Sequence, residues 1–407
     1  MHMSSQITHA VNTTKPWALG LWLAGLVLTL VLALQVHRSN ELAAQQRLER
    51  VADELAHGVQ ERFGLYELGL RGARGAVLAA GGMNLRNQAF AAYANSRELE
   101  REFPGARGFG LIQRVPRSEE ARFVAQLRAQ GLSEFAVREL ATHPHERLII
   151  RAVEPEALNR QALGLDIASD DNRREAARQA ALSGEARLTA PITLMQAAES
   201  PHRGFLLLLP VYAEGADLRT PGARERATQG WVYAPLVADA VLRGLSASLD
   251  EVQVRLLDQA EQAPFFRTDA DGERNSTGLS TLRALRIMGR SWQLQVDAQP
   301  ALLAAAQPRS PAAVLAVGAA LSSLGALLLG VLLRQRQQQL LALGLTELET
   351  ARPLRAFATS RLTLGALLLW LLGVLAYLAV AQSEIRARRA TELARHLQAQ
   401  AQQLVAQ

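Results

Sequence analysis

Three long apolar stretches interrupt a chain that otherwise mixes apolar and polar residues. Residues 16–36, 311–333 and 362–382 each run for about twenty positions without a charged side chain, which is the length that a helix needs to cross the hydrocarbon core of a bilayer. Charged residues stand at both ends of each stretch. The core helix of a soluble protein is the alternative for any single stretch, but cores rarely need so long an uncharged run. The pattern therefore predicts three transmembrane helices.

The first stretch also has the position of a cleaved signal peptide. Its apolar run is too long for that, and Leu34-Gln35-Val36 before His37 is not a small-x-small cleavage site. We therefore expect an uncleaved anchor.

The positive charges of the short segment 334–361 set the expected orientation. It contains Arg334, Arg336, Arg352, Arg355 and Arg361 against Glu347 and Glu349, and short positive loops stay in the cytoplasm. This predicts a multi-pass protein of the inner membrane. Residues 1–15 would be a cytoplasmic N-terminus, 334–361 a cytoplasmic loop, 37–310 a large periplasmic region and 383–407 a periplasmic helical tail.

A helical repeat of apolar positions follows the first predicted span. Leu48, Val51, Leu55, Val59, Phe63, Tyr66 and Leu70 are separated by three or four residues, so they share one helix face. The pattern predicts a stalk helix over residues 37–80, ended by Gly81-Gly82. Such a helix could pair with its copy in a homodimer through the stalk, or it could pack on its own domain.

The remaining periplasmic sequence alternates short helices with short strands. This predicts an α+β fold with a membrane-distal lobe over residues 81–215 and a membrane-proximal lobe over 216–310. The expected helices are 85–95, 118–131 (capped by Ser118), 171–182 (stopped at Gly184) and 236–249. The expected strands are 106–115, 135–138, 147–153, 186–189, 204–212, 231–235, 252–257, 265–268 and 291–296, and residues 217–229 are expected to be a polar connection.

Composition excludes several classes of protein. Among 407 residues, 49% are hydrophobic and 20% are charged, which is too apolar for a disordered chain. The absence of Cys excludes a disulfide framework and a thiol nucleophile. The net charge is +6, but the arginines alternate with acidic residues and lack stacking aromatics beside them, so we expect no nucleic-acid partner.

Motifs of enzyme chemistry are also absent from the sequence. There is no P-loop, no Gly-x-Ser-x-Gly elbow and no His-Glu-x-x-His pair. His143-Pro-His145 offers only two ligands and is expected to lie in an exposed loop, which makes a poor metal site. We expect no catalytic residue, no cofactor and no metal.

Several ordered blocks between the first two predicted spans resemble the CHASE domain, the extracytoplasmic ligand-sensing domain of cytokinin receptors and of many bacterial sensor kinases and cyclases. The blocks are Phe103-Pro-Gly-Ala-Arg-Gly-Phe-Gly-Leu-Ile-Gln-Arg-Val115, Asn159-Arg-Gln-Ala-Leu-Gly-Leu-Asp166, Asn172-Arg-Arg174, Ala180-Ala-Leu-Ser-Gly184, Leu188-Thr-Ala-Pro191 and Gly204-Phe-Leu-Leu-Leu-Leu-Pro-Val-Tyr212. The resemblance covers roughly residues 70 to 300.

The resemblance implies a stalk helix, two PAS-like lobes and a ligand in the distal lobe. By motif, Asp166 would accept hydrogen bonds from the ligand and the backbone of Leu188 would complete the contact, while Thr189 and Phe205 would line the same cleft. If it is buried, a carboxylate between Leu165 and Ile167 must find a donor or become protonated. That donor could instead come from Arg174 or from backbone N–H groups, Thr189 could bond to the backbone, and Phe205 could be an ordinary core ring.

These observations predict the input module of a membrane-bound sensory receptor. Its periplasmic domain would bind an unknown small molecule and pass a signal across the bilayer to a kinase or cyclase that this sequence does not contain. The alternative is a membrane-anchored scaffold that binds a protein and has no small-molecule ligand. An enclosed cavity with Asp166 at its wall would separate the two.

Overall fold

The structure is a computed structural model, and it describes residues 15–194, 203–242, 250–261, 263–268, 277–307 and 309–342. The chain divides into two compact units. One unit, here called the sensor unit, is Glu41–Pro308, and the other contains Met1–Asn40 together with the chain from Arg309 onward.

One long helix, α2 (Lys15–Ala79), begins the described chain. The seven apolar positions that the sequence places on one face, from Leu48 to Leu70, are all buried. The helix ends where predicted, because Gly81 and Gly82 adopt φ values of 96° and 73°, which side chains with a Cβ rarely tolerate. The predicted helix of residues 37–80 is therefore confirmed as part of α2.

The larger sheet of the sensor unit is antiparallel, in the order β2-β1-β6-β5-β3, with β4 paired to β5. Its strands are β1 (Phe109–Val115), β2 (Arg147–Glu154), β3 (Arg187–Leu188), β4 (Ile192–Thr193), β5 (Arg203–Tyr212) and β6 (Thr228–Val237). Because β6 lies between β1 and β5, the predicted lobe boundary at 215/216 is wrong: this strand completes the first sheet. Residues 135–138 form no strand, and only Arg138 makes an isolated bridge, to Leu165.

The second sheet has the order β8-β7-β10-β9. It contains β7 (Val252–Asp258), β8 (Phe266–Arg267), β9 (Ser280–Ile287) and β10 (Arg290–Ala298). The sequence did not predict β9. This edge strand pairs only with β10, and its first half is largely exposed, so its apolar signal is weak. The two antiparallel sheets and the long helix confirm a mixed helix-and-sheet architecture.

Short helices cover the strands or connect them. They are η1 (Gly82–Asn84), α3 (Asn87–Asn95), α4 (Leu99–Glu102), η2 (Arg117–Glu119), α5 (Glu120–Ala129), α6 (Glu156–Asn159), η3 (Arg160–Ala162), η4 (Ile167–Ser169), α7 (Asp171–Ser183), α8 (Pro221–Ala227), α9 (Ala238–Leu242) and α10 (Pro300–Ala306). Ser118 does not cap α5, whose preceding turn is η2, and the expected polar connection contains α8. Gly184 ends α7 in the left-handed conformation, as predicted.

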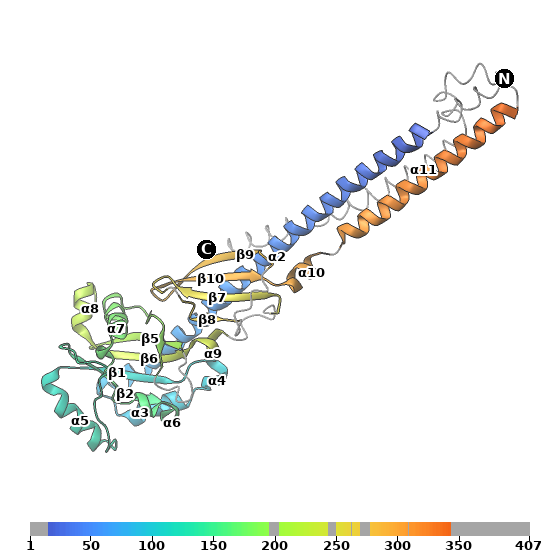
Figure 1. The fold of residues 1–407 in the computed structure, drawn as a ribbon. Coiled ribbons are helices and arrows are strands. Elements are labelled where there is room, and N and C mark those ends of the chain that lie inside the picture. The colour runs from blue at the N-terminus through green and yellow to red at the C-terminus, as the bar shows by residue number, and fades with distance from the viewer. Residues whose placement is uncertain are drawn as a thin grey trace. The chain divides into compact units, whose positions relative to one another are not determined.

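The buried face of α2 shares one core with both sheets (Figure 1). The Phe63 ring of α2 meets Trp292 of β10 edge-on, with ring centroids 5.2 Å apart. Trp292 in turn lies 5.2 Å from Phe205 of β5 and 4.8 Å from Phe265, which precedes β8. Both sheets therefore contact the long helix directly, and a movement of either sheet would act on it.

Within the described residues, two helices are long and apolar enough to cross a membrane: the N-terminal part of α2 and α11 (Pro311–Ala342). They lie alongside each other (Figure 1), and their contacts are made by small and hydroxyl residues. Trp22 Nε1 donates to Ser323 Oγ at 3.1 Å, while Thr29 lies against Gly318 and Ser322 against Gly25. The predicted third span, 362–382, the tail 383–407 and most of the loop 334–361 lie outside the described residues.

Candidate ligand-binding site

Asp166, the residue that the sequence marks as the acidic wall of the site, is fully buried, with 0% of its surface exposed. Its Oδ1 accepts hydrogen bonds from the backbone N–H groups of Leu148, at 2.9 Å, and Ala168, at 3.0 Å. Its Oδ2 lies 2.8 Å from His143 Nε2 and 3.1 Å from Arg147 Nη1. Both carboxylate oxygens are thus engaged inside the protein.

Arg147 is the positive centre of this cluster. It lies at the start of β2 and also forms ion pairs with Glu120 and Glu139. Burial alone would lower the pKa of Arg147, but its hydrogen bonds with Glu139, Glu120 and Asp166 outweigh that effect and raise it. The guanidinium is therefore a permanent cation that holds three carboxylates from separate segments together.

His143 corrects a prediction from the sequence. We expected the His143-Pro-His145 segment to be exposed, but the His143 side chain is buried against Asp166. A buried carboxylate attracts any nearby donor, and the ring nitrogen supplies one. His145 stacks on His143 with ring centroids 5.8 Å apart. Among the described residues, no group of three His, Asp or Glu side chains could hold a metal ion.

Leu188 and Thr189 have backbone partners that bind them to neighbouring strands. Leu188 N donates to Met288 O at 3.1 Å, a bond that connects β3 with the turn between β9 and β10. Thr189 N donates to Leu206 O at 3.0 Å, and its Oγ1 accepts from Leu206 N at 3.0 Å. The Thr189 hydroxyl thus extends the strand pairing, which is the alternative that the sequence left open.

Phe205 and its neighbour Leu206 point to opposite faces of β5. The Phe205 ring belongs to the aromatic core with α2, whereas Leu206 and Leu208 point to the face beneath α7. Leu188 and Phe205 thus belong to the core that α2 shares with both sheets, whereas Asp166 lies in the cluster with His143 and Arg147. Arg174 is not the partner of Asp166, because it bonds to Ala168 O and Asp171. A role of these residues in ligand binding stays a prediction.

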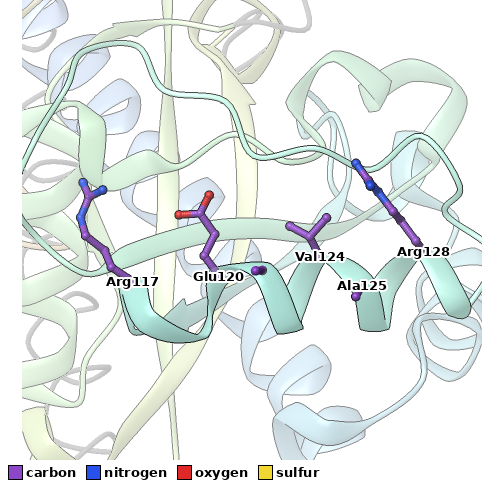
Figure 2. Close-up of a pocket in the computed structure, with 6 residues that line it drawn as sticks. Arg117, Glu120, Val124, Ala125 and Arg128 are labelled. Carbon is purple, nitrogen blue, oxygen red and sulfur yellow. The ribbon is translucent and has the colours of Figure 1, made fainter.

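A surface hollow lies along α5, lined by Arg117, Glu120, Ala121, Val124, Ala125 and Arg128 (Figure 2). Its charged groups already have partners in the protein. Arg117 donates to the carbonyls of His143 and His145, Glu120 pairs with Arg147, and Arg128 Nε donates to Phe135 O at 2.9 Å. The hollow adjoins the Asp166 cluster through Glu120 and Arg147. Its charged side chains already have protein partners and leave few hydrogen-bonding groups for a ligand.

Sequence reasoning missed two buried polar residues on the face of the larger sheet that α7 covers. Arg173 lies in the first turn of α7 and Tyr233 lies on β6, and both are buried. Arg173 Nε and Tyr233 Oη have no hydrogen-bond partner within the part of the chain that the structure describes. Arg173 stands within one of the sequence blocks that suggested a sensor, but no pattern in the sequence connects it to a tyrosine sixty residues downstream.

Comparison with known proteins gives a family match. Residues 83–266 match the family model of the CHASE domain. The crystal structure of the periplasmic sensory domain of the Campylobacter jejuni chemoreceptor Tlp1 superposes with a TM-score of 0.38 and 11% sequence identity, covering 64% of this chain and 96% of that one. No curated protein matches the chain.

Proposed function

The chain carries a CHASE domain, a periplasmic sensory domain, at residues 83–266, and from this premise we propose that it is the input module of a membrane-bound receptor. In this proposal the sensor unit binds a small molecule outside the cytoplasm and transmits a conformational change through the helices that anchor it. The observation that carries the proposal is the sensory domain itself, encoded between two helices able to cross a membrane.

The route of the signal follows from the packing of α2. The helix shares its buried face with both sheets, so a ligand that alters the larger sheet acts on α2 directly. The helix is continuous from Lys15 to Ala79. A ligand shifts such an equilibrium only by binding one arrangement more tightly than the other. Displacement of α2 against α11 is the change that would cross the bilayer.

The outer face of α2 supports a homodimer. Leu65 and Leu68 are 45% and 66% exposed, and they continue into Gly72, Gly75 and Ala79 at alternating spacings of three and four residues. This is the heptad spacing of a coiled-coil seam. Gly72 lies against the Tyr93 hydroxyl of the same chain, so the exposed surface at Leu65 and Leu68 is the part of this stripe suited to a second copy of the same helix.

The location and the output complete the proposal. The apolar helices and the basic residues at Arg334 and Arg336 favour the inner membrane, with the sensor unit on the periplasmic side. The output would be a kinase or a nucleotide cyclase, and this chain would have no catalytic role of its own. The engagement of Asp166 by protein groups favours the second candidate, a scaffold without a small-molecule ligand, so the test must separate the two.

The test first screens a metabolite library against the full chain in lipid nanodiscs, by its thermal unfolding midpoint. The chain has no Cys, so spin labels can then be placed at Val27→Cys on α2 and Leu324→Cys on α11, both exposed positions. We expect a stabilising metabolite to change the distance between these two labels. A label pair at Val27→Cys and Leu34→Cys, within one helix, is the control and should not respond.

The possible results are distinct. If no metabolite raises the unfolding midpoint, the scaffold replaces the sensor. If a metabolite binds but the α2–α11 distance is unchanged, transmission by displacement of these helices is wrong.

A further inference from the structure

Two unpaired polar atoms share one buried region of the sensor unit. Tyr233 Oη and Arg173 Nε have no hydrogen-bond partner among the described residues. Arg173 reaches Thr193 of the larger sheet, and Tyr233 belongs to the cluster packed between α7 and that sheet. Arg173 reaches this region from α7, which is joined to β6 by a 3.0 Å bond from Trp231 Nε1 to Ala177 O. The surrounding side chains are mostly apolar and include Leu206, Leu208 and Ile192.

The positive charge of the buried Arg173 guanidinium has few hydrogen-bond partners to stabilise it. Within the described chain its side chain makes a single hydrogen bond, from Nη2 to Thr193 O at 3.1 Å. Asp170 attracts the charge, but its Oδ1 accepts from the backbone N–H of Arg173 and caps α7. Burial lowers the pKa of Arg173 despite Asp170. A cation removed from water without a paired anion is costly to the folded state.

Arg151 shows what a purely structural buried arginine looks like in the same protein. It is also buried without a carboxylate partner, and burial lowers its pKa to about 10. Its guanidinium nevertheless donates to Met83 O, Leu85 O, Asn87 Oδ1 and Gln113 Oε1, and so joins η1 and α3 to the sheet. Arg173 lacks such a network.

The buried aromatic residues give the same contrast. Tyr66 donates to Pro104 O, Tyr212 to Ala181 O at 2.8 Å, and Trp292 to Asp258 Oδ2 at 3.2 Å. Tyr233 is as deeply buried as Tyr66 and has no such acceptor.

The other unpaired buried atoms in the described chain belong to groups with a strong partner elsewhere on the same side chain. Arg97 and Arg255 pair with Glu102 and Asp297, and His143 pairs with Asp166. Asn159 donates to two carbonyls. Arg173 and Tyr233 are thus the two described residues whose unpaired buried polar atoms have no strong partner elsewhere on the same side chain, and both lie at the α7-covered face of the larger sheet.

We propose that Arg173 and Tyr233 bind the carboxylate of a small organic acid, with Arg173 Nε and the Tyr233 hydroxyl donating to its oxygens. The inference rests on the proposed sensory function and names the ligand class and the residues that receive it. A carboxylate supplies both the missing counter-charge and the missing acceptors. The carboxylate would meet the side chain of Arg173 and not the helix end, which Asp170 already caps.

The test measures thermal unfolding of the full chain in nanodiscs with acetate, pyruvate and succinate as probes, against sodium chloride at equal ionic strength and adenine as a nitrogen-bearing probe without a carboxylate. We expect at least one carboxylate to raise the unfolding midpoint of the wild type. Arg173→Lys and Tyr233→Phe should each weaken that binding by about tenfold to a hundredfold, because each removes a hydrogen bond to a charged group.

Matched variants separate binding from folding. Arg174→Gln and Tyr212→Phe alter neighbouring residues whose polar atoms have protein partners, and both should keep the response to carboxylate. Without ligand, Tyr233→Phe should not lower the unfolding midpoint, since its hydroxyl loses no bond, whereas Tyr212→Phe should lower it.

Several results would overturn the inference. One is a carboxylate response that survives in both Arg173→Lys and Tyr233→Phe, and another is the absence of any response to the three acids. If adenine alone raises the unfolding midpoint, the sensory function is supported and an organic acid is excluded as the ligand class. If neither these probes nor any compound of the metabolite library raises the unfolding midpoint, both the carboxylate site and the sensory function are wrong.

Discussion

At the scale of single residues, Asp166 shows how far sequence reasoning reaches. The sequence indicated only that Asp166, if buried between Leu165 and Ile167, would need a donor or become protonated, and the structure buries it among protein N–H groups. The identity of those donors could not be read, because His143 and Arg147 come from a separate segment of the chain and only the fold brings them to Asp166. The same limit hid Arg173 and Tyr233, which share one buried region only because α7 packs on the larger sheet.

The first prediction concerns Asp166→Ala. The change leaves the N–H groups of Leu148 and Ala168 without their acceptor and removes one carboxylate from Arg147. We expect a loss of about 3–5 kcal/mol in the free energy of unfolding, the range for breaking a buried ion pair. Tryptophan fluorescence during urea unfolding of the full chain in detergent would measure it.

Two variants frame that result. Asp166→Asn keeps the acceptor oxygen and loses the charge, so its loss should be smaller. Asp217→Ala, at an exposed pair with Arg219, should leave the free energy of unfolding close to that of the wild type, because exposed ion pairs contribute little. An Asp166→Ala protein as stable as the Asp217→Ala protein would show that the cluster does not hold the lobe together.

At the scale of elements, the strength of the local pattern decided what could be predicted. Long periodic segments such as α2 and the apolar run of β5 were found, because burial on a fixed face leaves a clear repeat. The edge strand β9 and the one-turn helix pieces were missed, since half-exposed or very short elements carry little signal. The assignment of β6 to the second lobe was wrong for another reason. The order of the chain suggested that a new lobe begins at residue 216, but the pairing of β6 with β1 and β5 is a tertiary property that the local sequence does not reveal.

The second prediction concerns the contact between α2 and α11. A β-carbon added at Gly25 would lie 2.9 Å from Ser322 Cβ, and a disulfide joins β-carbons about 3.8 Å apart. A small local movement therefore suffices, and we expect the double variant Gly25→Cys/Ser322→Cys to form an intramolecular disulfide under mild oxidation. Mass spectrometry of proteolytic fragments would detect the linked peptides.

A matched pair of positions tests whether proximity is the cause. Gly20 and Gly330 have no non-local atom within 4 Å of an added β-carbon, so Gly20→Cys/Gly330→Cys should stay reduced. Equal oxidation of both pairs would mean that the helices do not pack through Gly25 and Ser322, and the small-residue contact proposed to carry the signal would lose its basis.

At the scale of the whole molecule, the order of the sequence blocks was sufficient to predict the CHASE domain that the family model matches at residues 83–266, and hydropathy predicted the two described helices that are able to cross a membrane. The sequence predicted a site at Asp166, but it could not suggest the carboxylate site proposed at Arg173 and Tyr233, because that proposal depends on which buried groups the fold leaves unpaired. Assembly is a property of the same kind, since it depends on which face of α2 the fold leaves uncovered.

The last prediction concerns that face. In a parallel coiled coil, residues of the seam lie opposite their own copies, and Leu68 lies at the centre of the exposed stripe between Leu65 and Gly72. We therefore expect Leu68→Cys to give a disulfide-linked dimer under mild oxidation in membranes, seen on a non-reducing gel. Leu218→Cys, a partly exposed position outside α2, should remain monomeric under the same conditions.

A second variant tests the same α2 interface at equilibrium, without a covalent link. Leu65→Asp/Leu68→Asp places charges only where both side chains already face outward, so the unfolding midpoint should stay close to that of the wild type. The mass of the nanodisc-embedded protein should fall from a dimer to a monomer, because the paired charges would repel across the seam. A variant that keeps the dimer mass would exclude this face as the interface, and the stalk would then serve its own domain alone.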